Sequence, residues 1–228
     1  MTRPAAVLWD MDGTLVDTEP CWMAAETAIV TEFGGRWTHE DALQMIGLPL
    51  MTAARILAEH GVPLPHEEIA RRLVDSVVTA VARELVWQPG ARELLEQLRD
   101  AGVPCALVTM SYRVLAEAVV AQAPDGVFQV MVTGDEVERG KPHPEPYLRA
   151  AELLGVRAED CVAVEDSPPG ISSALAAGVH TLGVQHIVPV EQRPGLSRVA
   201  TLEGVTLADL EGLVRGQVLD RLTGAAPG

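Results

Sequence analysis

The sequence contains little cysteine and no long apolar segment. Its three cysteines, Cys21, Cys105 and Cys161, are far apart and form no CxxC pair, which argues against a disulfide framework or a cysteine-ligated zinc site. No apolar run approaches the roughly 20 residues that a membrane-spanning helix requires. The N-terminal run "AAVLW" ends at Asp10 and is too short for a secretory signal. We therefore expect a cytoplasmic protein.

Basic residues are scarce as well. The chain has 17 Lys and Arg against 32 Asp and Glu, a formal net charge of −15. This charge argues against binding to nucleic acid or to an anionic membrane. Lys141 is the single lysine, and its retention indicates a position that needs a compact, flexible ammonium group. The expected partner is a small molecule, and a monomer is favoured.

Apolar residues make up 48% of the chain, which is enough for a sizeable core. Short apolar runs predict strands at 5–9, 103–108, 128–132, 161–164, 179–184 and, more weakly, 198–202. Helical patterns occur at 91–101, 112–122, 146–154 and 207–214. Strands that alternate with helices predict an α/β fold with a doubly wound, Rossmann-like parallel sheet.

The interval between the first two strands breaks this alternation. It spans roughly 90 residues, whereas a simple crossover needs about a dozen. Its pattern predicts no strand, and helices at about 18–33, 39–46, 50–60 and 66–84. We expect residues 17–87 to form a helical cap domain, inserted into a core domain of residues 1–16 and 88–228. A helical insert beside an acidic cluster is typical of a lid over a site.

Polar side chains follow the carboxyl ends of several predicted strands. Ligands of open parallel sheets bind at these strand ends, and we expect the side chains there to lie together. The set is Asp10, Asp12, Thr109, Lys141, Glu165 and Asp166.

This set has the composition of a site for Mg²⁺ and phosphate. Carboxylates gathered at one edge repel each other, and a divalent cation relieves that repulsion. Oxygen ligands without histidine or cysteine favour Mg²⁺. Thr109 and Lys141 add a hydroxyl group and a cation for an anionic ligand.

Two aspartates suit two different tasks in phosphoryl chemistry. One of Asp10 and Asp12 can act as a covalent nucleophile towards phosphorus. The other acts as general acid and then as general base. Gly13 permits a sharp turn of the backbone next to the ligand. Thr14 is expected to bond to nearby backbone and to hold Asp12 in place.

The motifs "DMDGTL", "LVTMS", "GKPHP" and "VEDSPPG" occur in this order and resemble those of the haloacid dehalogenase-like superfamily. The resemblance extends from about residue 5 to residue 184. It implies that Asp10 is the nucleophile and a Mg²⁺ ligand. It implies that Asp12 is the general acid/base and binds the metal through its carbonyl group.

The resemblance also assigns the remaining residues at the strand ends. Thr109 binds the phosphoryl group, and Lys141 stabilises its charge. Asp166 is a Mg²⁺ ligand, whereas Glu165 ligates or orients a metal-bound water. The candidate substrate-binding residues are Gly13, Thr14, Glu19, Trp22, Gly47, Leu48, Met110 and Ser111.

The stretches "DTEP" and "GKPHPEPY" resemble the β-phosphoglucomutase-like subgroup, which contains both phosphatases and mutases. Where the mutases have a cap arginine and a cap histidine, this chain has Leu50 and Trp22. We therefore expect a Mg²⁺-dependent phosphatase that acts on sugar or polyol phosphates through a phospho-aspartyl intermediate. A phosphosugar mutase is the alternative.

Three other classes fit the sequence less well. Dehalogenases of the superfamily lack the second aspartate of the DxD motif, which is Asp12 here. Receiver domains of signalling proteins are shorter and have no helical insert. A binding protein without catalysis would not need the complete set of site residues.

Overall fold

The computed structural model describes residues 3–46 and 48–222. Its centre is a six-stranded sheet in the order β3-β2-β1-β4-β5-β6, and all paired strands are parallel. The strands are β1 (Val7–Trp9), β2 (Cys105–Val108), β3 (Phe128–Val132), β4 (Val162–Glu165), β5 (His180–Val184) and β6 (Ser197–Val199). The predicted α/β class and parallel sheet are confirmed.

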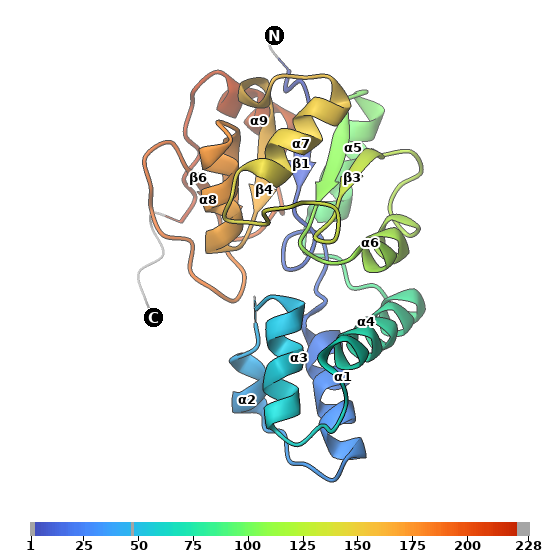
Figure 1. Ribbon diagram of the computed structural model, residues 1–228. Helices are drawn as coiled ribbons and strands as arrows, with labels where there is room; N and C mark the ends of the chain where they lie inside the picture. Colours follow the sequence, from blue (N-terminus) through green and yellow to red (C-terminus); the bar gives the residue numbers. More distant parts are fainter. Residues whose placement is uncertain (1–2, 47, 223–228) are drawn as a thin grey trace.

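Helices cover both faces of this sheet (Figure 1). One face packs against α5 (Ala91–Asp100), α6 (Arg113–Val120) and α9 (Leu207–Val214), and the other against α7 (Glu145–Leu154) and α8 (Pro168–Ala176). Successive strand residues point to opposite faces. In β1, accordingly, Val7 and Trp9 belong to the first core cluster and Leu8 to the second.

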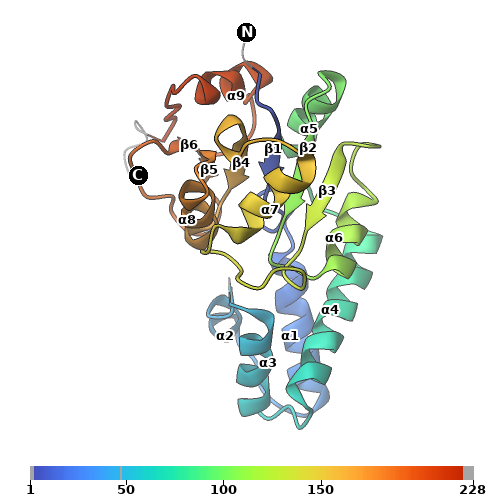
Figure 2. The same cartoon turned by 45° about the horizontal axis from the view of Figure 1, so that its top comes forward.

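The insert is helical, as predicted. It consists of α1 (Glu19–Glu32), α2 (His39–Leu43), α3 (Leu50–Glu59) and α4 (His66–Arg83). Figures 1 and 2 show these helices together beyond the carboxyl ends of the strands. The long helix α4 packs against α1, α3 and α6, and Gln122 Nε2 donates a hydrogen bond of 2.9 Å to the Val81 carbonyl.

Two adjacent segments connect the insert to the sheet. Val16 and Trp87 form an isolated antiparallel bridge. The amide of Asp17 donates to the Val86 carbonyl at 2.8 Å, and the amide of Gln88 donates to the Leu15 carbonyl at 2.8 Å. This paired crossing lies at the predicted domain boundary, although the division into two domains remains a prediction. In the part of the chain that is described, no helix has both the length and the apolar character needed to cross a bilayer.

The sequence did not predict the helix α8. Ser167 is its N-cap and accepts a 3.1 Å hydrogen bond from the Gly170 amide, and prolines occupy the first helical positions. Both features are start signals. Gly170 is required by a tertiary contact, because a Cβ atom there would collide with the Glu165 carboxylate.

This collision predicts that Gly170→Ala destabilises the fold by about 1–3 kcal/mol, the usual cost of overpacking. The matched control is Gly212→Ala in α9, where a Cβ atom would meet only the end of the Gln217 side chain, at 2.7 Å. That variant should be neutral or up to about 1 kcal/mol more stable. Denaturant unfolding measures both. Equal stability of Gly170→Ala and the wild type would show that the Glu165 side chain is free to move.

Candidate active site

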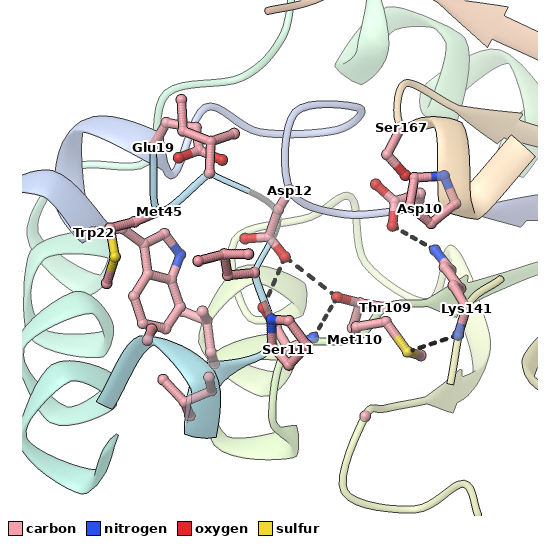
Figure 3. A pocket seen from close by; sticks show the side chains of 18 of the residues that line it. Asp10, Asp12, Glu19, Trp22, Met45, Thr109, Met110, Ser111, Lys141 and Ser167 are labelled. Carbon is pink, nitrogen blue, oxygen red and sulfur yellow. Dashed lines mark hydrogen bonds and ion pairs between the residues drawn. The ribbon is translucent and has the colours of Figure 1, made fainter. Parts of the chain in front are cut away.

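A cavity of about 730 Å³ lies between the carboxyl edge of the sheet and the helical insert. The sheet side contributes Asp10, Asp12, Thr109, Lys141 and Asp166, among others. The insert contributes residues from all four of its helices, α1 to α4, and from the segment after α2. The predicted strand-end residues are thus brought together, and Figure 3 shows part of this arrangement.

Lys141 connects two strand ends through its ammonium group. Nζ donates to Asp10 Oδ1 at 2.6 Å and to Glu165 Oε1 at 2.6 Å, and also to the Val108 carbonyl at 2.8 Å. The Lys141 side chain is 4% exposed. Burial alone would lower the pKa of Lys141, but the two carboxylates outweigh this effect and raise it. The single lysine of the chain is therefore a buried, charged contact of the predicted nucleophile.

Glu165 is completely buried behind this lysine. Its Oε1 atom also accepts a hydrogen bond of 2.7 Å from the Tyr147 hydroxyl group. Its Oε2 atom accepts from the Ser167 amide at 3.2 Å and from the Ser167 hydroxyl at 3.1 Å. Tyr147 was not among the residues predicted for the site. It lies in α7 within "GKPHPEPY", and its buried position on the helix gives no sign of a polar partner on β4.

Asp12 is held by three hydroxyl groups. Its Oδ1 accepts from Thr18 at 2.5 Å, and its Oδ2 accepts from Ser111 at 2.8 Å and from Thr109 at 3.3 Å. Figure 3 shows Asp12 on the side of the site that faces Glu19 and Trp22. Thr18 is the N-cap residue of α1, but its hydroxyl group makes no capping bond to the helix. It fixes Asp12 instead.

Thr14 has a different partner from the expected one. Its hydroxyl group donates to Asp166 Oδ1 at 3.0 Å, and neither Thr14 nor Gly13 lines the cavity. Gly13 has φ +84°, and a Cβ atom there would collide with Asp166 Oδ2. Both residues, predicted to bind substrate, therefore act on the position of the Asp166 carboxylate.

Three carboxylates of the site are close enough to share a cation. Asp10, Glu165 and Asp166 each offer an oxygen within 4.8 Å of the others. Burial, with Glu165 as the next cause, raises the pKa of Asp10 to about 7 against the pull of Lys141. Burial, followed by Asp10 and Glu165, raises the pKa of Asp166 well above its usual value. A buried, electron-rich set of hard oxygen donors fits Mg²⁺.

The insert side of the cavity is mainly apolar. Trp22, Leu48 and Leu50 line it, whereas Gly47 lies outside the described residues. Glu19 also lines it, and burial, together with Asp12 and Asp17, raises its pKa to about 7. Met110 lines the sheet side, and its Sδ atom accepts a hydrogen bond of 3.3 Å from the Lys141 amide.

Two lining residues, His186 and Glu26, were not predicted to belong to the site. His186 lines the cavity, with Nε2 3.9 Å from Asp17 Oδ1 and Nδ1 3.4 Å from Gln88 Nε2. Glu26 lines the cavity from α1. Both residues lack a motif, and only the packing of distant segments brings them to the site.

A family profile, "Haloacid dehalogenase-like hydrolase", matches residues 7–184. The chain belongs to this family, and it is a phosphoric monoester hydrolase.

Two similar proteins are phosphatases by name. The phosphorylated carbohydrates phosphatase of Thermotoga maritima is 34% identical over 79% of this chain and 85% of its own length. Hexitol phosphatase A of Escherichia coli is 36% identical over 80% of this chain and 83% of its own length. Among solved structures, CbbY from Rhodobacter sphaeroides in complex with phosphate has a TM-score of 0.81 and 27% identity, and the match covers 91% of this chain and 99% of that one.

The raised pKa values of Asp10 and Asp166 predict a pH-dependent stabilisation by Mg²⁺. Their folded-state pKa values lie above the unfolded ones, so the metal-free fold loses stability as pH rises from about 4 to above 7 and these groups ionise. Mg²⁺ binds the ionised form. At about 100 times its Kd it should add about 2.7 kcal/mol, or roughly 5–10 °C in Tm, at about pH 8 and much less at about pH 5.

Thermal unfolding with Mg²⁺ or with EDTA at both pH values measures this effect. Asp166→Asn should remove most of it, because the variant loses an ionised ligand. The same shift in wild type and in Asp166→Asn would place the cation elsewhere.

Proposed function

We propose that the protein is a Mg²⁺-dependent phosphatase of small phosphorylated metabolites, in the class of sugar and polyol phosphates, and that it acts through a phospho-aspartyl intermediate. The observation that carries this proposal is the convergence of Asp10, Asp12, Lys141 and Asp166 at one end of a cavity. The names of the two phosphatase relatives, which denote phosphorylated carbohydrates and hexitols, support the substrate class.

Asp10 is the proposed nucleophile. An oxygen of its carboxylate forms a bond to phosphorus while the ester P–O bond breaks, and the leaving oxygen takes a proton from Asp12. Lys141 already contacts Asp10 Oδ1, so its charge lies where the transferring phosphoryl group arrives. In this proposal the hydroxyl groups of Thr109 and Ser111, which now donate to Asp12, turn to bind that group.

The second step reverses the roles. Asp12 takes a proton from a water molecule, which attacks phosphorus, and the bond between phosphorus and the Asp10 oxygen breaks to release phosphate. Asp10 and Asp166, with the Asp12 carbonyl group, would hold Mg²⁺. When bound, the metal supplies positive charge for the phosphoryl oxygens. Thr18 keeps Asp12 at the same place in both steps.

Residues 17–87 form the cap in this proposal, and residues 1–16 and 88–228 form the core. Exposed apolar side chains line both sides of the cavity, with Leu48 on the insert and Ile187 and Val188 on the core. Closure of the cap would bury these side chains and exclude water from the site. The paired segments at Val16 and Trp87 are the proposed hinge.

The lining of the cavity favours hydrolysis over the mutase alternative. A mutase that moves a phosphoryl group through its own aspartate must hold a sugar with two phosphoryl groups, and therefore needs a second anion site. Among the described lining residues, Lys141 is the sole lysine or arginine. Trp22 and Leu50 occupy the insert side, where a second phosphate would need a cation.

Substitutions of the two aspartates test the mechanism. Asp10→Asn should abolish turnover, because the amide does not form the covalent intermediate. Asp12→Asn should lower kcat by a factor of about 10²–10⁴. Phosphate release from a panel of sugar, polyol and glycolate phosphates, with Mg²⁺ or with EDTA, measures activity, and circular dichroism verifies folding.

Three results would contradict this proposal. Turnover by folded Asp10→Asn would show that Asp10 is not the nucleophile. Full activity in excess EDTA would show that the reaction does not require Mg²⁺. Conversion of β-glucose 1-phosphate to glucose 6-phosphate without release of phosphate would establish the mutase.

A further inference from the structure

Glu26 is a buried acid on the part of α1 that faces the cavity. Its exposed fraction is 5%, and it lines the cavity together with Trp22, Met23 and Leu73. Its Oε2 atom has no hydrogen-bond partner, and the described residues give Glu26 no ion pair. Burying a carboxyl oxygen without a partner is unfavourable, and a ligand that donates a hydrogen bond to the carboxyl group offsets this cost. The packing of the insert therefore does not explain why a glutamate occupies this position.

Trp37 stands behind this carboxyl group. Its indole Nε1 lies near enough to lower the pKa of Glu26, but neither Nε1 nor Oε2 has a partner with hydrogen-bond geometry. Burial is the larger effect and raises the pKa of Glu26 to about 7. The described residues thus leave Oε2 of this carboxyl group without a hydrogen bond of good geometry, at the wall of the cavity.

The position of Glu26 along α1 gives its distance from the chemistry. Glu19, Trp22 and Glu26 follow each other at helical spacing and line one cavity. Burial and the nearby Asp12 raise the pKa of Glu19, which lies at the site end of the helix. Glu26 is two turns further, about 10 Å along the axis. A leaving group that reaches Glu26 from the phosphoryl site must be extended.

We propose that Glu26 determines specificity by accepting a hydrogen bond from a hydroxyl group at the far end of the leaving group. The substrate is then a phosphate ester of a polyhydroxylated, extended alcohol. This inference rests on the proposed phosphatase function and narrows it.

A hydroxyl group fits this position better than an ammonium group. A hydroxyl group donates to an ionised carboxylate and also pairs with a neutral carboxyl group, because it both donates and accepts. An ammonium group only donates and pairs well with the ionised form alone. The nearby walls, Met23, Met45, Leu73 and Val74, are apolar and offer no second acceptor for an ammonium group.

The test compares three phosphate esters of similar length in the presence of Mg²⁺: a hexitol phosphate, n-hexyl phosphate and 6-aminohexyl phosphate. The variants are Glu26→Leu and Glu26→Gln. The control is Glu32→Gln, the same change on the same helix at an exposed carboxylate that pairs with Arg72. The measured quantities are kcat/KM for each ester and the melting temperature.

Glu26→Leu should lower kcat/KM for the hexitol phosphate by roughly ten- to a hundredfold, and leave that for n-hexyl phosphate unchanged or higher. Glu26→Gln retains an acceptor and should lose less, and Glu32→Gln should match the wild type. The melting temperature of Glu26→Leu should stay the same or rise, since the change removes a buried carboxyl group without a partner.

Three outcomes would overturn the inference. Equal losses for the hexitol and n-hexyl esters, with a lower melting temperature, would make Glu26 a structural residue. Unchanged kcat/KM in both Glu26 variants would show that Glu26 does not contact the substrate. A wild-type preference for the 6-aminohexyl ester would assign an ammonium ligand. Absence of phosphate release by the wild type from every ester would instead refute the phosphatase proposal itself, before any substitution at Glu26.

Discussion

The contact of Lys141 with Asp10 and Glu165 is the constraint on which the site depends. Four carboxylates, those of Asp10, Asp12, Glu165 and Asp166, meet at the ends of two adjacent strands, and a single buried ammonium group faces them. The ammonium group offsets part of their repulsion and leaves a net negative charge. The surrounding residues serve the same need: Thr14 and Thr18 each donate a hydroxyl group to a carboxylate, and Tyr147 donates to Glu165.

The crowded carboxylates also determine which positions near the site must be glycine. Gly13 and Gly170 belong to different motifs, yet a Cβ atom on either would enter the space of a site carboxylate. Steric crowding around the site carboxylates thus requires glycine at both positions. The site is closely packed on the sheet side, whereas the insert side holds a wide, mostly apolar space. Rigid placement of the reacting groups and freedom for the leaving group are therefore separated between two parts of the fold.

The sequence predicted the features that depend on local pattern. Apolar runs located all six strands within a few residues, and the strand-end rule grouped Asp10, Asp12, Thr109, Lys141 and Asp166 correctly in space. It failed where distant contacts decide. Helix α8 begins with a serine cap and two prolines, which are local start signals, but only the contact with Glu165 explains Gly170 inside it.

The partners of the two threonines near Asp12 illustrate the same limit. Thr14 and Thr18 are each within six residues of Asp12, and sequence alone favours the nearer one. The turn at Gly13 directs Thr14 to Asp166 and leaves Thr18 to hold Asp12.

Glu26 shows how specificity escapes motif-based analysis. The groups that handle phosphorus are common to every ester, so they gather in short motifs at strand ends. The groups that meet the leaving group lie on helices, where a single buried acid resembles any other helical glutamate in the sequence. Its burial becomes visible only when α1 is packed against its neighbours. A polar side chain that is buried there without a partner destabilises the insert. Its proposed role in binding the substrate explains why the protein keeps this unfavourable residue.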